Sequence, residues 1–522
     1  MLWGIQDDPD LMNTKTIARN SVWLGAEFVI EFIAAVATSV AIARELGPAE
    51  LGYYVYISWL TRISIVLGNI GLPASALKYM AQYWASGNRG VARSVFDGTV
   101  RMQVLLSCLI AAGGWVFVLA FGDPAYRLAA LLLVLSIIPA MVNTMPTVAN
   151  IATENPAANV PGSIVSAGIY TLGVTLSLLF GWRLTGVAAS ILLSRTLEAF
   201  VRAIPVKRWI QEVPCVKLPE DLRKKMKAFS AQSIVLMVLG VVVWDRSEIL
   251  FLKHYAADIR QIAYYSVSFG MAENILGVIR IFGNSIGTTM RAQFGRDEMG
   301  LRRMLPTAVG YIALLAFPLY FGLASLSRPT ILLAYGHAYA PAVGVLMVTA
   351  LLTVPKAFQV PLQSFLQASE RQGFMVWWSL CCAGINLSLD WLLIPRYGAL
   401  GAAYGNGLAQ LVAATGLWIG AAKMFDLQMP YRRVGRSLVC SLIMGAVVCL
   451  VSRPFGPVAA ALVGIPVGIV VFFLFLRLSP FLDRNDLNRL HQMRSSCPPA
   501  VRVWFDRAIN LIVVQSPRKT TA

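Results

Sequence analysis

Twelve ionisable side chains lie inside the long apolar segments of this sequence, where charge is costly. A charged group at the centre of a membrane-spanning helix costs about 2.5–3.5 kcal/mol when it faces lipid. Twelve are more than mutual pairing alone would suggest, so they predict a hydrated cavity that binds or carries something charged. The five bases are Arg62, Arg195, Arg246, Arg280 and Lys356, and the seven acids are Glu27, Glu31, Glu198, Asp245, Glu248, Glu273 and Asp390.

Seven of these residues are predicted to face a substrate. Basic side chains in a cavity can hold an anionic group. For Arg62, Arg280 and Lys356 the alternative is a structural ion pair with a nearby glutamate. Arg195 and Glu198 are three positions apart, and a structural pair is the favoured interpretation there. The set predicted to face a substrate is Arg62, Arg246, Arg280, Lys356, Glu27, Glu31 and Glu273.

A second group of polar residues is predicted to bind a small cation. Asn386 and Asp390 are four positions apart and share one helix face, and Asp245 and Asn406 reach a similar depth in their own helices. Two carboxylates and two amides supply the hard oxygen ligands that such a cation prefers. Na⁺ and H⁺ both fit this site as coupling ions. The alternative is a hydrogen-bond network between helices.

Catalytic and metal sites are not expected. His254, His337 and His491 lie in three separate segments, and the seven cysteines show no C-x-x-C spacing. No phosphate-binding glycine-rich loop occurs, so ATP hydrolysis is not expected. We expect no catalytic residue, no metal ligand and no cofactor apart from the coupling ion.

The composition shows which elements must position these residues. Of the 522 residues, 57% are apolar and 13% are charged, whereas soluble proteins have roughly 45–50% and about 25%. A large soluble enzyme, a disordered chain and a secreted disulfide scaffold are therefore excluded. An all-α polytopic membrane protein with about 14 transmembrane helices is predicted. The predicted spans are 22–43, 51–71, 102–121, 128–148, 159–180, 184–204, 229–252, 262–285, 306–327, 342–363, 374–395, 399–421, 436–452 and 455–477.

The formal charge of +18 is explained by orientation in the membrane. With both termini in the cytoplasm, 31 of the 44 basic residues fall in cytoplasmic segments and 8 in external ones. Lysine and arginine collect on the cytoplasmic side of membrane proteins. Arg202 is counted in the cytoplasmic set. A nucleic-acid partner is therefore not expected.

The chain is predicted to contain two lobes joined by a basic linker, whose lysines and arginines are interpreted as a solvated surface. Either Met1 or Met12 can be the start. The predicted parts are a cytoplasmic N-tail (1–21), an N-lobe (22–204), a basic cytoplasmic linker (205–228), a C-lobe (229–421), helices 13 and 14 (436–477) and a cytoplasmic tail (478–522).

The two lobes repeat each other at a shift of about 211–216 residues. Residues 184–189 correspond to 399–404, and 146–154 correspond to 361–370. Six spans separate equivalent positions, so the repeats share one orientation. Two parallel six-helix repeats plus two C-terminal helices are a transporter architecture.

Four segments resemble known sequences. The segment 386–403 (NLSLDWLLIPRYGALGAA) resembles the helix 11–12 signature of Wzx-like polysaccharide flippases. The segments 43–54, 71–79 and 244–246 are similar to their helix 1–2 connection, the amphipathic segment after helix 2, and helix 7. The resemblance covers roughly residues 12–480.

The resemblance implies membership of the multidrug/oligosaccharidyl-lipid/polysaccharide exporter superfamily. It implies two six-helix lobes, alternating access and no ATPase. The implied substrate is an undecaprenyl-pyrophosphate-linked oligosaccharide, moved from the cytoplasmic to the periplasmic leaflet for exopolysaccharide, O-antigen or capsule synthesis. The implied location is the bacterial inner membrane, as a multi-pass protein. The expected partners are this lipid-linked oligosaccharide, the phospholipid bilayer, and a polysaccharide polymerase with its export machinery.

The resemblance also bears on the two polar groups. Some lipid II flippases of this superfamily bind a cation through residues whose pattern Asp245, Asn386, Asp390 and Asn406 match. Those flippases gather arginines in helices 1 and 2, where this chain has glutamates and a single arginine, Arg62. A glycan other than lipid II is therefore favoured.

Two other functions remain as alternatives. A drug/cation antiporter of the same superfamily would bind a cationic substrate, and seven buried acids against five bases leave this open. A membrane-embedded glycan polymerase or ligase would carry catalytic residues on a large periplasmic loop. All external loops predicted here are short, which disfavours an enzyme.

Overall fold

The structure is a computed structural model that describes residues 9–231, 246–256, 258–293, 298–428 and 430–478, without the side chains of most residues before 35 and of several between 284 and 301. These parts of the chain are helical, with short 3-10 turns and no strand. In lipid only a helix or a closed barrel satisfies every backbone polar group internally, which explains the helical fold of so apolar a chain. The all-α prediction is confirmed.

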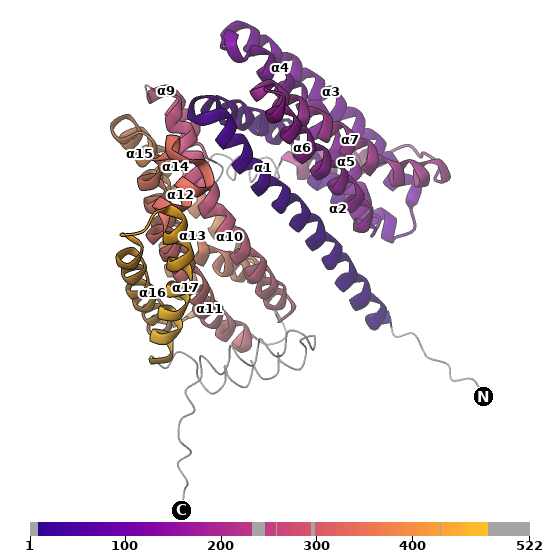
Figure 1. Ribbon diagram of the computed structural model, residues 1–522. Coiled ribbons are helices and arrows are strands. Elements are labelled where there is room, and N and C mark those ends of the chain that lie inside the picture. The colour runs from indigo at the N-terminus through magenta and orange to yellow at the C-terminus, as the bar shows by residue number, and fades with distance from the viewer. Residues whose placement is uncertain (1–8, 232–245, 257, 294–297, 429, 479–522) are drawn as a thin grey trace, which may run out of the picture. The chain divides into compact units, whose positions relative to one another are not determined.

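The chain divides into two compact units, residues 1–253 with 258–263, and residues 254–257 with 264–522. Figure 1 colours the helices from indigo in the first unit to yellow at the end of the second. The helices of the first unit are α1 (Pro9–Gly68), α2 (Leu72–Ala85), α3 (Arg89–Phe121), α4 (Arg127–Leu135), α5 (Ile137–Ala152), α6 (Val160–Leu179) and α7 (Arg183–Glu212). After α9 (Glu248–Tyr255) follow α10 (Arg260–Gln293), α11 (Glu298–Ser325), α12 (Ser327–Tyr335), α13 (Ala342–Ala368), α14 (Gln372–Tyr397), α15 (Ala399–Phe425), α16 (Tyr431–Ser452) and α17 (Pro457–Leu478).

Eleven of the described helices are long and apolar enough to cross a membrane, and the bent pair Ala35–Gly68 and Leu72–Ala85 makes a twelfth if it forms one span. Twelve of the fourteen predicted spans coincide with these. Half of the side chains of the predicted span 22–43 lie outside the described residues, as do residues 232–245 of the predicted span 229–252. Residues 1–8 of the predicted N-tail and 479–522 of the predicted C-tail also lie outside them.

The first two predicted spans meet in one bent element, α1. Its helical conformation is interrupted at Gly47, whose φ is 72°, and Pro48 follows. Glycine adopts this left-handed conformation without a steric cost, and proline fits the first turn of the next helix. The bend therefore lies in the predicted connection between spans one and two.

The two predicted repeats end two of their helices in the same way. Beyond α5, Glu154 has φ 58°, and beyond α13, Glu370 has φ 56°. In both, the next amide reaches back five residues: Asn155 N donates to Asn150 O at 2.8 Å, and Arg371 N to Leu366 O at 2.9 Å. This bonding pattern and the left-handed residue are features of a Schellman cap. The caps are 216 residues apart, within the range of the sequence repeat.

The last helix pair packs on the second unit. The Ser437 hydroxyl of α16 donates to the Ala313 carbonyl of α11 at 2.8 Å. Met444 and Val448 of α16 form a buried cluster with Phe472 of α17. The two C-terminal helices therefore form a part of this unit's core.

The predicted linker over 205–228 is largely helical. Helix α7 continues through Pro205 to Glu212, eight residues beyond the predicted end of the sixth span. A second helix begins at residue 220 and is described to residue 231. Leu222 and Met226 of this helix are buried in a cluster with residues of α2, α3 and α5. Its lysines and arginines are exposed, as expected, but its apolar face belongs to the core.

Candidate functional site

A cavity of about 650 Å³ lies within the first unit, lined by α1, α4, α5, α6 and α7. Arg62 enters it from α1, and Arg195, Glu198 and Arg202 enter it from α7. Among the described residues, these three guanidinium groups and one carboxylate are the charged side chains that line it. Positive charge therefore predominates in the described part of the lining.

Arg62 and Arg195 are both exposed. The hydroxyl-bearing side chains of Tyr54 and Tyr170 also line the cavity. Guanidinium and hydroxyl groups donate hydrogen bonds, and guanidinium binds phosphate oxygens in a bidentate manner. This lining suits an anionic, hydrogen-bond-accepting ligand.

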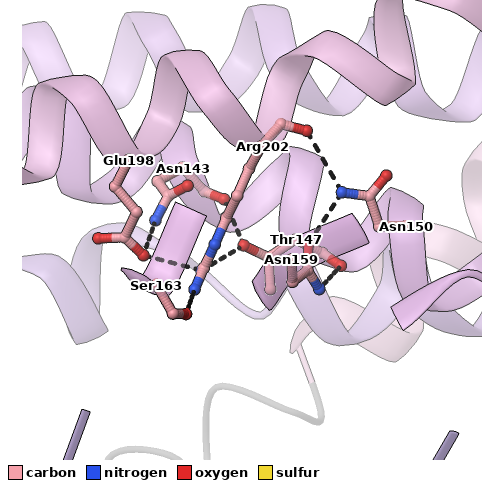
Figure 2. A network of polar contacts seen from close by, with 7 residues as sticks. All are labelled: Asn143, Thr147, Asn150, Asn159, Ser163, Glu198 and Arg202. Carbon is pink, nitrogen blue, oxygen red and sulfur yellow. Dashed lines mark hydrogen bonds and ion pairs between the residues drawn. The ribbon is translucent and has the colours of Figure 1, made fainter. Parts of the chain in front are cut away.

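The other two charged residues form a buried network, which Figure 2 shows from close by. The Arg202 guanidinium lies 2.9 Å from the Glu198 carboxylate. It also donates to the Thr147 hydroxyl at 2.9 Å and to the Ser163 hydroxyl at 2.6 Å. The Asn143 amide donates to the same Glu198 oxygen at 2.9 Å. The network therefore ties α7 to α5 and α6.

The network continues through two asparagines. The Asn150 amide donates to the Asn159 side-chain oxygen at 2.8 Å and to the Arg202 carbonyl at 3.3 Å. The Asn159 amide donates to the Thr147 carbonyl at 3.3 Å. Asn150 and Asn159 are 1% and 0% exposed. These bonds stabilise the wall of the cavity where α5 ends and α6 begins.

Two interpretations of the sequence need correction here. The pattern pairs Glu198 with Arg195, whereas the structure pairs it with Arg202, one turn further along α7. Arg202, which is counted in the cytoplasmic set although it falls within the predicted span 184–204, is 5% exposed. Helix α7 continues past residue 204 to Glu212, so hydropathy places the end of the helix too early. The i,i+4 spacing of Glu198 and Arg202 was the signal available in the sequence.

In the second unit, the structure brings together three of the predicted substrate-facing residues. Lys356 Nζ of α13 lies 2.5 Å from one carboxylate oxygen of Glu273 of α10. Arg280, two turns along α10, lies 3.5 Å from the other oxygen. The Lys356 side chain is 8% exposed and that of Arg280 is 49% exposed. The two bases therefore differ in exposure: Lys356 is buried, and Arg280 is half-exposed.

The remaining residues of that set are less fully described. Arg246 lies two residues before the start of α9 in a left-handed conformation, with φ 63°. Glu27 and Glu31 belong to α1, but their side chains lie outside the described residues. Their predicted roles stay predictions.

Three of the four predicted cation ligands lie on α14 and α15. Asn386 donates its amide to Asp390 at 3.2 Å, and Asp390 is completely buried. The Asp390 carboxylate lies so close to Gly405 of α15 that a side chain at Gly405 would collide with the carboxylate. Asn406, the residue after Gly405, is 7% exposed. Asp245 lies outside the described residues. Within the described chain, no three His, Cys, Asp or Glu residues form a metal-binding group.

Comparison with known proteins identifies relatives of this chain. A family model described as "Polysaccharide biosynthesis protein" matches residues 41–344. The probable low-salt glycan biosynthesis flippase Agl15 of Haloferax volcanii is 21% identical over 185 residues, which are 34% of this chain. The match spans 39% of that relative's length.

Solved structures share the fold. The lipid II flippase MurJ in its inward closed conformation superposes with a TM-score of 0.71 at 16% identity, over 88% of this chain and 98% of that one. A single-residue mutant of the Vibrio cholerae MATE transporter VcmN gives 0.56 at 13% identity, over 79% and 98%. An inward-facing MATE family transporter of the MOP superfamily gives 0.60 at 12% identity, over 78% and 98%. These similarities define the fold of this chain.

Proposed function

Since this chain belongs to the polysaccharide biosynthesis protein family, we propose that it is a flippase for an undecaprenyl-pyrophosphate-linked oligosaccharide. It would carry this lipid from the cytoplasmic to the periplasmic leaflet of the bacterial inner membrane by alternating access. The glycan would serve exopolysaccharide, O-antigen or capsule synthesis. The names of Agl15 and MurJ, both flippases, support this class of substrate.

The charge of the first unit's cavity carries the proposal. In the part of the lining that the structure describes, Arg62, Arg195 and Arg202 stand against one carboxylate, that of Glu198. Arg202 and Glu198 form a buried ion pair, whereas Arg62 and Arg195 line the cavity as exposed side chains. A pyrophosphate would match these groups, whereas a cationic drug would be repelled.

The same cavity would reduce the energetic cost of moving the polar headgroup across the membrane. A sugar-pyrophosphate headgroup cannot enter hydrocarbon without losing its hydrogen bonds to water. A polar, charge-lined path replaces those bonds, while the prenyl chain stays in lipid. The protein would therefore lower the free-energy barrier to flipping, because polar side chains replace the water around the headgroup. No covalent bond would be broken.

The test is transport by the full chain in liposomes that contain a fluorescent undecaprenyl-pyrophosphate-linked oligosaccharide. Arg62→Gln and Arg195→Gln each remove one charge-assisted contact worth about 1.5–3 kcal/mol, so each is expected to slow flipping about 10- to 100-fold. Arg260→Gln is the control, because Arg260 pairs with Asp258 in an exposed turn outside the cavity. Its rate is expected to equal that of the unchanged chain.

Two outcomes would overturn the proposal. Unchanged flipping in both cavity variants would exclude the arginines as pyrophosphate ligands. Accumulation of a cationic dye against its gradient, with no flipping of the lipid, would identify the chain as a drug/cation antiporter instead.

A further inference from the structure

A second cavity of the first unit lies at its predicted cytoplasmic end. It has a volume of about 720 Å³ and is lined by the start of α2, by α3 and by residues 215–231. Its apolar lining includes Leu72, Met102, Leu218 and Met226. Neither the proposed flipping path nor the cation cluster uses this cavity.

The segment that forms one wall is firmly attached. The amide of Val216 donates to the Ser94 hydroxyl of α3 at 3.1 Å, and Arg93 donates to the Val213 carbonyl. Further along, the Ser75 hydroxyl of α2 donates to the Met226 carbonyl at 3.4 Å. The wall therefore has a defined position on the first unit.

The cavity is rimmed by basic side chains. Arg101 comes from α3, and Lys217, Arg223 and Lys227 come from the wall segment. Asp97 is the one carboxylate that lines the cavity, and it lies 3.5 Å from Arg93. Within the described residues, none of the four rim cations has an ion-pair partner within 4 Å. The rim therefore suits an anion.

The position of the rim along α3 indicates what kind of anion. Directly after Arg101, α3 exposes apolar side chains, beginning with Met102 at 44%, Val104 at 40% and Leu105 at 55%. Such a surface faces hydrocarbon in a membrane-spanning helix. The four cations thus lie where the hydrocarbon begins, at the level of lipid phosphates. A soluble anion would gain nothing from the apolar floor, whereas an acyl chain would.

We propose that this cavity binds one anionic phospholipid of the cytoplasmic leaflet. Its phosphate lies among Arg101, Lys217, Arg223 and Lys227, and its first acyl carbons cover Met102 and Leu218. The bound lipid joins the wall segment to α3 and so holds the chain between the lobes in place.

The test compares two double variants of the full chain in detergent by native mass spectrometry, with phosphatidylglycerol or phosphatidylcholine added. Arg223→Gln with Lys227→Gln removes two rim charges, and binding of phosphatidylglycerol is expected to weaken about 10- to 30-fold. Lys224→Gln with Lys225→Gln removes the same charge from the same helix at exposed positions that do not line the cavity. This control is expected to bind as the unchanged chain does.

A second measurement uses the unchanged chain and so does not depend on the folding of variants. Cys215 lines the cavity and is exposed. Alkylation of Cys215 is expected to be slower in nanodiscs that contain phosphatidylglycerol than in nanodiscs of phosphatidylcholine alone. Equal losses in both double variants, or equal protection by both lipids, would overturn the proposal. Displacement of phosphatidylglycerol by undecaprenyl pyrophosphate at lower concentration would do so too, by identifying a substrate site.

Discussion

Arg202 shows how a single charge is accommodated inside the first unit. Its side chain is 6% exposed and that of its partner Glu198 is 12% exposed, so both have lost most of their water. Thr147, Ser163 and Asn143 replace that water with hydrogen bonds. Hydrogen bonds of this kind offset part of the cost of burying an ion pair.

Removing one member of this pair should therefore destabilise the protein far more than removing a cavity arginine. Arg202→Ala is expected to cost about 3–5 kcal/mol, because Glu198 stays buried without its counter-ion. Arg195→Ala, at an exposed position on the same helix, is expected to cost less than about 1 kcal/mol. Thermal unfolding of the two purified variants measures the difference. Equal melting temperatures would show that the network does not carry this stability.

Asp390 is predicted to couple transport to a cation. The expected effect of Asp390→Asn is loss of the dependence of flipping on an imposed Na⁺ or H⁺ gradient, because the change removes the one charge described in this cluster. Asp258→Asn, in an exposed turn, serves as the matched control. Flipping rates with and without each gradient give the answer. Retained coupling in Asp390→Asn would count against a cation site here.

At the scale of helices, glycine allows two pairs of helices to pack closely at equivalent places of the repeat. A side chain at Gly186 of α7 would collide with Ser177 of α6, and one at Gly401 of α15 would collide with the Leu393 carbonyl of α14. The two glycines are 215 residues apart and align in the sequence repeat. The same helix pairs thus approach closely in both units for the same reason.

Substitution at this contact should separate α14 from α15. Gly401→Ala is expected to cost about 1–3 kcal/mol, because the backbone of α14 cannot yield to an added methyl group. Gly384→Ala in α14 faces open space and is expected to be neutral or slightly stabilising, since alanine favours helix. Thermal unfolding of both variants provides the test. A Gly401→Ala protein as stable as the Gly384→Ala protein would contradict it.

The sequence predicted the helices better than it predicted their contacts. Apolar runs located twelve spans and the connection between the first two, in which the bend at Gly47 lies, because hydropathy depends on neighbouring residues. The pairing of Glu198 with Arg202 and Asn143 joins two helices. Hydropathy carries no information about which side chain lies opposite. The extension of α7 to Glu212 was missed for a related reason: its last turns are polar but pack on the unit's own core.

For the whole molecule, the uneven distribution of basic residues predicts the orientation in the membrane. Helix α14 offers a test, because exposed arginines flank its two ends. Arg371, before its first residue, is predicted to lie in the cytoplasm, and Arg396, in its last turn, outside. Both termini are predicted to be cytoplasmic.

In a chain without native cysteines, Arg396→Cys is expected to react with a membrane-impermeant maleimide in intact spheroplasts. Arg371→Cys is expected to react only after permeabilisation. The two positions control for each other, since both are exposed and belong to one helix. The opposite pattern would invert the orientation and place the proposed lipid cavity on the external side.

The two left-handed caps, at Glu154 and Glu370, offer a route to a sturdier preparation of this protein. A residue with a side chain pays roughly 1–2 kcal/mol for that conformation, and glycine does not. Both glutamates are exposed, so glycine would remove little packing. Because the two caps are equivalent, Glu154→Gly and Glu370→Gly test the same effect at two places in one molecule. A detergent-stable form can therefore be sought at two sites that do not line the first unit's cavity. Similar gains in melting temperature at both sites would support the explanation.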